Sequence, residues 1–497
     1  MAWKSGREEL GVGWSGAVSK RDMWGQMKSV WVGALLLAAM AAMAQEVAIV
    51  HVTVINPGKG KGQADMTIVT HGQRIMTVGR AREVKVPASA QVVEGKGKYV
   101  IPGLWDMHTH FRDPKRDLEM YVANGVLGIR NMGGPASEVF PLRQAIAEGR
   151  QLGPKIVASG PIVDGPDSSA SPSLTVSVKT PEEARATIRS LKREGADLIK
   201  VYDQLTRDEY RAIADEARKQ GIPFAGHIPG TISVREASEA GQLTVEHGMM
   251  LGGGCTAEDQ YMRLRTSQEV FQEAMRTKNF SLIPAKIARD ETFLLDHFSQ
   301  QRADATYALL ARNHTYITPT LVTQRSLTFV DELSKQDDPR MRYVSADDLS
   351  WWKPEKGMLT RYRTPEYIAM RKRQYAKTME EIPRAVAQGV RLLAGTDITI
   401  PFTYPGFSLH DELKLFVQAG LTPMQALETA TTNPAAALGL EKTWGRVAAG
   451  YSANFVVLTA DPLADIGNTE KIDAVVVQGK LLQRAELDKT LEEAKVR

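Results

Sequence analysis

Short apolar runs that alternate with amphipathic stretches dominate the centre of the chain. The stretches at 181–194 and 208–220 carry apolar residues at helical spacing, and the runs beside them are rich in Val, Ile and Leu. Buried strands that alternate with helices form parallel sheets, because each helix crosses back over the sheet. Eight such runs predict an α/β fold, a (β/α)8 barrel of the TIM type over residues 103–439. The predicted strands are 99–107, 126–131, 155–162, 198–202, 223–227, 243–247, 316–322 and 390–397.

The two ends of the folded part have a different pattern. Their runs are β-branched, alternate partly between apolar and polar residues, and lie beside turn residues such as Asn56-Pro57-Gly58. The runs are 47–55, 66–78, 454–458 and 474–482. β-rich ends around one long centre predict a single small β-sandwich domain that combines residues 45–102 with residues 440–497.

Two long segments interrupt the regular alternation of the barrel. They follow the sixth and seventh predicted strands, span roughly 68 and 67 residues (248–315 and 323–389), and are rich in charged helix formers. In a barrel, the segment that follows a strand lies at the catalytic face. We therefore expect these two segments to form a lid over the substrate.

The N-terminus predicts export. Residues 30–44 carry no charge, follow the basic Lys28, and end in the small-residue pattern Ala42-Met43-Ala44 that signal peptidase reads. Fifteen residues are short for a hydrocarbon core of about 30 Å. Cleavage after Ala44 would leave a secreted or periplasmic protein without a stable membrane span, and the alternative is an uncleaved membrane anchor. Met27 is a conventional start for such a signal, so residues 1–26 are interpreted as an over-extended reading frame.

Charge and cysteine content exclude several classes of protein. Lys and Arg number 62 against 58 Asp and Glu, a formal charge of +4, so the chain has no basic field for nucleic acid. The one cysteine, Cys255, rules out an intrachain disulfide, a zinc finger and an iron–sulfur cluster. No base neighbours Cys255 in the sequence, which favours a passive thiol. The sequence leaves homo-oligomerisation open.

Candidate metal ligands stand where the predicted barrel strands end. His108 and His110 close the first strand, and side chains two residues apart on a strand point to the same side. His227, His247 and Asp397 close the fifth, sixth and eighth strands. The carboxyl ends of barrel strands hold the active site, so these side chains are expected to converge on a metal site.

Lys200, in the apolar run of the fourth strand, is the exception in this set. A bare ammonium group would repel metal ions, and the ordinary alternative is a surface lysine whose aliphatic part packs on apolar neighbours. Carboxylation of its amine by carbon dioxide would convert Lys200 into a carboxylate that can bridge two divalent ions.

With these residues the chain resembles the metal-dependent amidohydrolase superfamily, in the binuclear subgroup that has a carboxylated lysine. The resemblance covers about residues 47–482. Within the superfamily, the chain is most similar to the secreted imidazolonepropionase-like and prolidase-like branches. Imidazolonepropionases themselves lack the bridging lysine. The motifs that carry the resemblance are Pro102-Gly103-Leu104 before His108 and His110, then Lys200, His227, His247 and Asp397, and then Gly406-Phe407-Ser408-Leu409-His410, Thr432-Asn433-Pro434-Ala435 and Gly445-Arg446-Val447.

The resemblance implies two divalent ions, with Zn²⁺ as the expected metal, held by His108, His110, carboxylated Lys200, His227, His247 and Asp397. It also implies a hydrolytic mechanism. Two ions that share a water lower its pKa, and the resulting bridging hydroxide attacks a carbonyl that a metal polarises. Asp397 is expected to be the catalytic group, because it can take the proton and pass it to the leaving amine.

The predicted function is hydrolysis of an amide or peptide bond in a small molecule, such as a dipeptide or an N-acyl amino acid. Tyr202, His410 and Arg130 are the candidate substrate contacts, because a phenol, an imidazole and a guanidinium can hold a carboxylate. Structural roles remain the alternative for all three. Two other readings stay open: a cyclic amide or lactone hydrolase, and a catalytically silent barrel that serves as a binding or scaffold protein.

Overall fold

The computed structural model describes residues 45–247, 256–257, 268–357 and 360–496. The predicted signal at 1–44 and the thiol of Cys255 lie outside the described residues. From Glu46 onward the chain forms one compact unit, so the domain boundaries that we drew from the sequence stay predictions.

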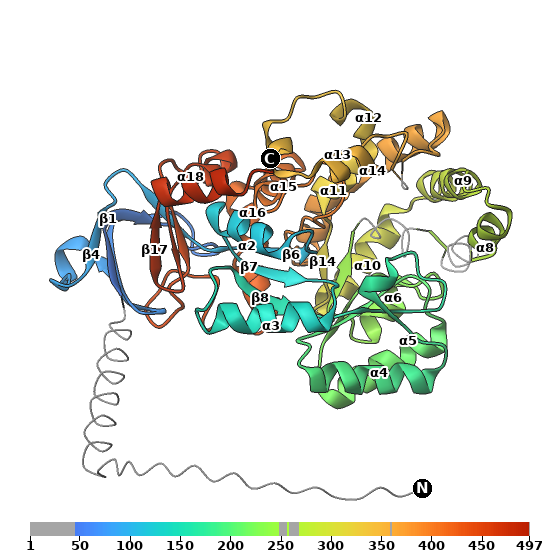
Figure 1. Cartoon of the computed structure of the whole chain (residues 1–497), viewed down its shortest axis with the longest axis horizontal. Coiled ribbons are helices and arrows are strands. Elements are labelled where there is room, and N and C mark those ends of the chain that lie inside the picture. Colours follow the sequence, from blue (N-terminus) through green and yellow to red (C-terminus); the bar gives the residue numbers. More distant parts are fainter. Residues whose placement is uncertain (1–44, 248–255, 258–267, 358–359, 497) are drawn as a thin grey trace, which may run out of the picture. The chain divides into compact units, whose positions relative to one another are not determined.

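An eight-stranded sheet combines strands from both ends of the chain (Figure 1). Its order is β17-β16-β15-β5-β1-β2-β3, and β4 pairs with β1. The pairs β1–β2, β2–β3 and β15–β5 are antiparallel. The strands are β1 (Glu46–Val54), β2 (Gln63–His71), β3 (Arg74–Arg80), β4 (Gln91–Glu94), β5 (Tyr99–Pro102), β15 (Phe455–Leu458), β16 (Ile472–Val477) and β17 (Lys480–Gln483).

Alternation of side chains along these strands supplies the core of the sheet. Ile49, Ile68 and Phe455, from β1, β2 and β15, belong to one buried cluster. The amide of Ile75, in the edge strand β3, donates to the carbonyl of Tyr451 at 2.9 Å, and Tyr451 lies four residues before β15. This bond brings the edge strand back to the middle of the sheet, so the sheet curls around the cluster. The prediction that both chain ends build one β-domain is therefore confirmed.

The central residues form two mostly parallel sheets with helices outside them. One sheet has the order β6-β7-β8 and the other has the order β10-β9-β11-β12-β13-β14. The strands are β6 (Leu104–Thr109), β7 (Val126–Asn131), β8 (Lys155–Ala158), β9 (Ile162–Asp164), β10 (Thr175–Ser177), β11 (Ile199–Val201), β12 (Phe224–Gly226), β13 (Thr244–Glu246) and β14 (Tyr316–Thr318).

Backbone hydrogen bonds join these two sheets at both edges. On one side the amide of Asp197, just before β11, donates to Ala158 of β8 at 2.9 Å. On the other side Leu393 donates to Ile317 of β14 at 2.9 Å, and Met107 of β6 donates to Ala394 at 2.8 Å. The chain around Leu393 and Ala394 thus completes the (β/α)8 barrel that the sequence predicts.

Four predicted strands differ from the observed ones. The first divides at Gly103 into β5, which pairs in the β-domain, and β6, which opens the barrel. The third divides into β8 and β9, and the seventh ends at Thr318 because α11 begins at Leu321. The run at 390–397 forms only an isolated bridge between Leu392 and Ile317, since its neighbours bond irregularly to two different strands.

Helices follow the barrel strands in the predicted alternation (Figure 1). The sequence prediction for α4 has the observed bounds, because Thr180 caps its N-terminus and Gly195 ends it with a left-handed φ of 101°. The helices of the barrel are α2 (Pro114–Ala123), α3 (Ala136–Ala147), α4 (Pro181–Glu194), α5 (Arg207–Gln220), α6 (Val234–Glu239), α15 (Phe407–Gln418), α16 (Pro423–Thr429) and α17 (Thr432–Ala437), and α18 (Arg484–Glu493) ends the chain.

The two long segments are helical where the structure describes them. The first contains α8 (Gln268–Thr277), α9 (Leu282–Asp296) and α10 (Gln300–Arg312), and the second contains α11 (Leu321–Thr328), α12 (Val330–Leu333), α13 (Ala346–Trp351) and α14 (Pro365–Ala387). Across the described ranges, no helix combines the length and the apolar character needed to span a bilayer.

Candidate metal centre

Two histidines and an aspartate meet at the carboxyl end of the barrel strands. His108 and His110 lie at the end of β6, and Asp397 follows the irregular eighth strand. Oδ1 of Asp397 is 3.5 Å from Nε2 of His108 and 3.6 Å from Nε2 of His110. Two ligand atoms that bind one tetrahedral zinc ion at 2.0–2.1 Å lie about 3.4 Å apart. The three side chains therefore have the spacing of a group that could hold one metal ion.

Two further histidines extend this group. His227 follows β12 and His247 follows β13. The ring centroids of His108 and His247 are 4.7 Å apart, as are those of His227 and His247. Nδ1 of His247 lies 3.9 Å from Oδ2 of Asp397. The four imidazoles thus form one continuous cluster around Asp397.

Lys200 of β11 brings a buried amine to the same end of the barrel. The residue is 1 % exposed, and its Nζ has no hydrogen-bond partner among the described residues. Nζ is 5.8 Å from the centre of the Tyr202 ring, which in turn stacks on His227 at 4.1 Å. An unpaired buried ammonium is costly, whereas a carboxylated lysine would supply oxygens to metal ions. The donor set therefore fits a pair of divalent ions.

Two glycines allow the backbones to approach this closely. A Cβ on Gly226 would lie 2.2 Å from the carbonyl oxygen of Val201 and 3.0 Å from Cδ of Lys200. A Cβ on Gly395 would lie 2.9 Å from Cβ of His108. Glycine at these two positions lets the strands that carry Lys200 and His108 pack against their neighbours.

Every imidazole of the cluster is oriented by a protein partner on one ring nitrogen, Nδ1. Such partners fix the ring and leave the other nitrogen for a metal. The pairs are His108 with Glu246 (2.8 Å), His110 with the carbonyl of Gly133 (3.1 Å), His227 with Asp203 (3.0 Å) and His247 with Thr320 (2.9 Å). None of these four partners stands out in the sequence as part of the site. Glu246 had one visible signal, a charged residue inside an apolar strand.

Arg130, a predicted substrate contact, is fully buried beneath the cluster. Its Nη2 pairs with Glu246 at 2.8 Å, its Nε donates to the carbonyl of Met107 at 2.6 Å, and its Nη1 donates to Thr244 at 2.9 Å. The guanidinium therefore holds Glu246, which holds His108. We leave Arg130 out of the substrate contacts for this reason.

His410, the second predicted substrate contact, is also buried. It lies on α15, where Nδ1 pairs with the hydroxyl of Thr469 and Nε2 with the carbonyl of Asn124, both at 2.9 Å. Both ring nitrogens are engaged within the protein, so His410 is a packing residue here. Tyr202, the third candidate, is half-buried and stacks on His227, and its hydroxyl has a side-chain hydrogen bond with Ser169.

Burial governs the charge of the cluster. It lowers the pKa of His110 to about 4 and the pKa of His108 and His247 well below the usual value, so these imidazoles are neutral and can bind a metal. Burial also lowers the pKa of Lys200 to about 8, although the carboxylates of Glu246 and Asp397 oppose that shift. It raises the pKa of Asp397 to about 7, against the pull of the Lys200 cation.

The backbone is strained at two of these residues. His247 and Asp397 have φ values of 63° and 51°, in the left-handed region that non-glycine residues rarely adopt. Such conformations persist where surrounding contacts hold them, and they cluster at functional sites. The strain at two adjacent candidate ligands supports a functional reason for this geometry.

Arg112 is a residue of this face that the sequence analysis did not single out. It follows His110 by two residues, its Nη2 donates to the carbonyl of Ile400 at 3.3 Å, and its guanidinium lies 5.0 Å from the centre of the Trp352 ring. Within the described ranges, no carboxylate lies within salt-bridge distance of Arg112. Its sequence signal was its position two residues after His110.

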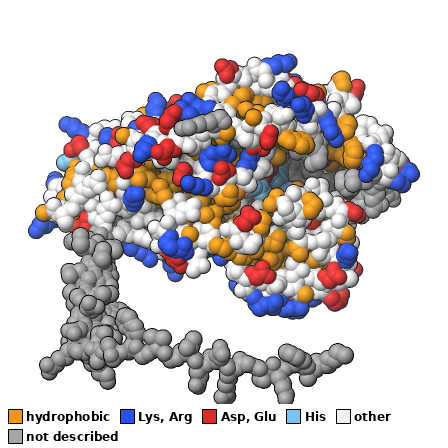
Figure 2. All heavy atoms as spheres, in the orientation of Figure 1, with side chains coloured by type: hydrophobic (Ala, Val, Ile, Leu, Met, Phe, Trp, Pro, Cys, Tyr) orange, Lys and Arg blue, Asp and Glu red, His pale blue; other side chains and the backbone are white. Residues whose placement is uncertain are grey.

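The cluster reaches solvent through its outer members. The side chains of His110, His247 and Asp397 are 12 %, 15 % and 14 % exposed, whereas His108 is 1 % exposed. Figure 2 shows histidine side chains inside a hollow of the molecular surface. A small molecule could therefore approach the cluster from this hollow.

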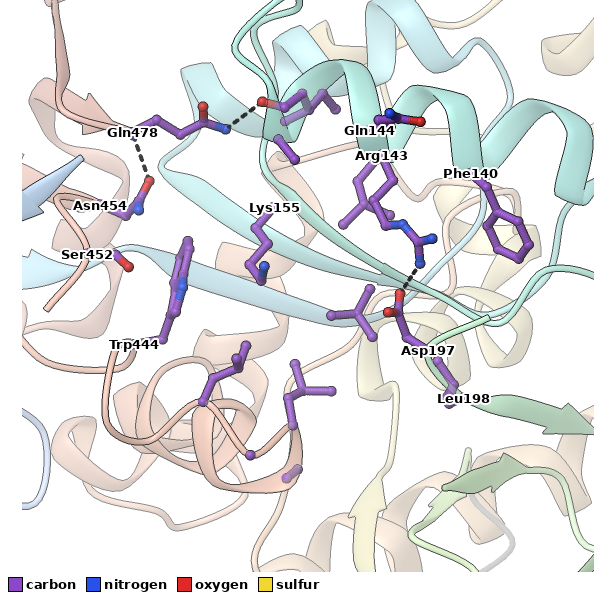
Figure 3. A pocket seen from close by; sticks show the side chains of 18 of the residues that line it. Phe140, Arg143, Gln144, Lys155, Asp197, Leu198, Trp444, Ser452, Asn454 and Gln478 are labelled. Carbon is purple, nitrogen blue, oxygen red and sulfur yellow. Dashed lines mark hydrogen bonds and ion pairs between the residues drawn. The ribbon is translucent and has the colours of Figure 1, made fainter. Parts of the chain in front are cut away.

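A cleft of about 1060 Å³ lies elsewhere, at the amino ends of the barrel strands (Figure 3). It is lined by Lys155 at the start of β8, Asp197 just before β11 and Trp444. Arg143 in this cleft pairs with Asp197 and donates to the carbonyl of Gly195 at 2.8 Å. In barrel proteins this end serves stability, so the cleft is not our candidate active site.

Fold and site together define a (β/α)8 barrel with a histidine-rich candidate metal centre at its carboxyl end. The profile of the amidohydrolase family matches residues 99–482. This chain therefore belongs to the amidohydrolase family, and it is identified as a hydrolase that acts on carbon–nitrogen bonds.

Three proteins illustrate its similarities. It is 22 % identical to the ochratoxinase of Aspergillus niger, over 85 % of this chain and 83 % of that protein. It is 22 % identical to an imidazolonepropionase of Acinetobacter baumannii, over 82 % and 90 %. The crystal structure of a putative prolidase from Bifidobacterium longum has a TM-score of 0.65 and 26 % identity, and the match covers 91 % of this chain and 99 % of that one.

Proposed function

We propose that this chain is an exported binuclear metal hydrolase that cleaves the amide or peptide bond of a small, carboxylate-bearing molecule. The observation that carries the proposal is the convergence of four imidazoles, one carboxylate and an unpartnered buried lysine amine at the carboxyl end of the barrel. Family membership supports the reaction class.

The ligands divide naturally between two ions. His108, His110 and Asp397 would hold the first, and His227 and His247 would hold the second. Lys200, once carboxylated, would add carboxylate oxygens to the donor set. Two Zn²⁺ ions would supply a water of lowered pKa and a polarised substrate carbonyl.

Asp397 is the group proposed to move the proton. Its carboxyl is in contact range of three imidazoles and is partly exposed to the hollow, so it can face both the metal centre and a substrate. In amide hydrolysis the amine leaves as a neutral molecule only if it receives a proton. Asp397 would accept that proton from the attacking water and deliver it to the amine nitrogen.

Substrate recognition is proposed to rest on Tyr202 and Arg112. Burial raises the pKa of Tyr202, so its hydroxyl stays protonated, and a substrate oxygen would take the place of Ser169 as its hydrogen-bond partner. The guanidinium of Arg112 forms no salt bridge with a described residue, although the charges of Asp348 and Asp117 act on it, and guanidinium groups bind carboxylates well. A relative named as a putative prolidase supports a dipeptide or an N-acyl amino acid as the first substrates to examine.

Substrate class can be tested with the chain from residue 45 onward, loaded with Zn²⁺. A panel of dipeptides, N-acyl amino acids and lactones separates the proposal from lactone hydrolysis. We expect carboxylate-bearing amides to be hydrolysed, and a chelator to abolish that activity until Zn²⁺ is restored. Hydrolysis of lactones alone would replace the proposed substrate class, and a purified chain that hydrolyses nothing and holds no metal would favour a silent scaffold.

Where the chain resides is a separate measurement. Expression of the full sequence in a bacterial host, followed by periplasmic extraction, should yield a chain that begins at Gln45. An intact N-terminus in the membrane fraction would indicate the uncleaved anchor instead.

A further inference from the structure

The N-terminal turn of α11 contacts one candidate metal ligand, His247, and the residue before another, Asp397. Thr320, the residue just before the helix, pairs through Oγ1 with Nδ1 of His247 at 2.9 Å. Thr323, in the first turn, donates its hydroxyl at 2.7 Å to the carbonyl of Thr396, the residue before Asp397. A displacement of this turn would therefore move His247 directly and Asp397 through its neighbour Thr396.

This turn needs support from outside the helix. The first N–H groups of a helix have no acceptor within it. The hydroxyl of Thr320 would ordinarily cap them, but it faces His247 and makes no capping bond. Thr320 also has a left-handed φ of 47°, which is strained for a β-branched residue.

Glu412 of α15 supplies the missing acceptor. Its Oε1 accepts from the amide of Leu321 at 2.9 Å, and its Oε2 accepts from the amide of Val322 at 2.7 Å. Glu412 is 0 % exposed and lies 90 residues away from Val322 in the sequence. Burial raises the pKa of the Glu412 carboxyl to about 8, and the two N–H groups oppose that shift because they stabilise the ionised form. A buried carboxyl group that accepts both N–H groups fixes the position of the helix terminus.

We propose that Glu412 is a positioning residue of the metal centre, acting through the first turn of α11 on His247 and on Asp397. This inference rests on the proposed function, because it assigns a role towards the two ions. Glu412 touches neither ligand. Its removal should let Thr320 relax from the left-handed conformation and turn its hydroxyl back to cap the helix, away from His247.

The test compares Glu412→Gln with Glu381→Gln as a matched control. Glu381 of α14 is equally buried and accepts from the hydroxyl of Tyr307 at 3.1 Å, but it joins α14 to α10 instead of holding a ligand. Zn²⁺ affinity is measured by competition with a chromophoric chelator, and folding by thermal unfolding of the metal-free proteins.

We expect Glu412→Gln to weaken Zn²⁺ binding by about 10- to 100-fold, the usual effect of losing a partner that orients a ligand. Glu381→Gln should lower the unfolding temperature but keep the wild-type affinity. Wild-type affinity in Glu412→Gln, or an equal loss in Glu381→Gln, would overturn the inference. A wild-type chain that holds no ion would refute the metal centre itself, which distinguishes that failure from failure of Glu412 alone.

The route through Thr320 is tested by a double-mutant cycle. Thr320→Ala removes the hydroxyl that orients His247, and Thr320→Ser retains it. If Glu412 acts through this hydroxyl, Glu412→Gln should add little to the loss of affinity in Thr320→Ala, because coupled sites are not additive. Thr320→Ser should keep most of the affinity. Fully additive losses would contradict the proposed route.

Discussion

The two ends of the barrel differ in the kind of polar groups they bury. The cleft at the amino ends has a volume of about 1060 Å³, and its buried-facing charges pair with each other: Arg143 pairs with Asp197, and both also bond to the backbone. The carboxyl end has the unpartnered amine of Lys200 and the strained backbone of His247 and Asp397. A buried amine without a hydrogen-bond partner and a strained backbone therefore mark the carboxyl end of the barrel as the candidate site.

The same contrast separates two arginines. Arg130, under the metal centre, has no exposed surface and pairs with an equally buried Glu246. Arg143, in the cleft, is 23 % exposed and its partner Asp197 is 40 % exposed. When one residue of a buried salt bridge is removed, the other charge stays buried without a partner. At an exposed salt bridge, water takes the place of the removed residue. Only the first arrangement can hold a ligand rigidly.

The largest effect is expected for Lys200→Ala. Loss of the bridging group should release most of the metal and lower kcat/KM by about 10³-fold, since metal catalysis contributes several kcal/mol. Short carboxylic acids should restore part of the activity by entering the vacated space, and Lys200→Arg should fail because a guanidinium cannot take up carbon dioxide. Lys155→Ala, at the opposite end of the barrel, is the control and should stay active. Full activity in Lys200→Ala would end the carboxylated-lysine assignment.

Asp397→Asn should lower kcat by at least about 10²-fold, because the amide cannot carry the proton from water to the leaving amine. It should keep much of the metal, since an amide oxygen and the other ligands remain. Steady-state kinetics with a measured zinc content checks both points. A mutant that only raises KM would make Asp397 a group that positions the substrate.

The contrast between the two ends can be measured as the free energy of unfolding of two variants, Arg130→Met and Arg143→Met. We expect the first to lower the free energy of unfolding by about 3–5 kcal/mol, because Glu246 is left buried without its cation. The second should cost about 0–1 kcal/mol. Urea unfolding of both metal-free proteins measures the difference. Equal losses would show that the two ends of the barrel are not distinguished by their buried charges.

Arg112→Met should have the smallest effect, confined to substrates with a free carboxylate. A charge-assisted hydrogen bond contributes about 1.5–3 kcal/mol, so the preference for a dipeptide over its C-terminal amide should fall by about 10-fold or more. Arg340→Met is the control, because Arg340 also lies over an aromatic ring, Tyr404, but already pairs with Asp338 at 2.8 Å. An unchanged acid-to-amide ratio in Arg112→Met would remove this residue from recognition.

The sequence predicted those features that depend on local pattern. The bounds of β7 and α4 and the placement of the candidate ligands at strand ends follow from periodicity, capping residues and barrel topology. The predicted domain boundary falls at Gly103, but the predicted strand 99–107 runs across it, because an uninterrupted apolar run does not reveal where one strand ends and the next begins.

The partners of the ligands could not be predicted in this way. Glu246 is 138 residues from His108, and Glu412 is 91 residues from Leu321, so no local pattern links them. Arg130 and His410 illustrate the converse error. Their residue types suit substrate binding, but burial commits them to protein partners, and burial of one particular side chain depends on the tertiary packing.

The central claim is that the carboxyl end of this barrel holds two metal ions, and a direct measurement is the zinc content of the purified chain. Inductively coupled plasma mass spectrometry, after growth in zinc and removal of loosely bound ions, should find close to two Zn²⁺ per wild-type chain and a clear loss in Lys200→Ala. Lys155→Ala, in the cleft at the opposite end, should match the wild type. Fewer than about one tightly held ion per wild-type chain, or full occupancy in Lys200→Ala, would contradict the account.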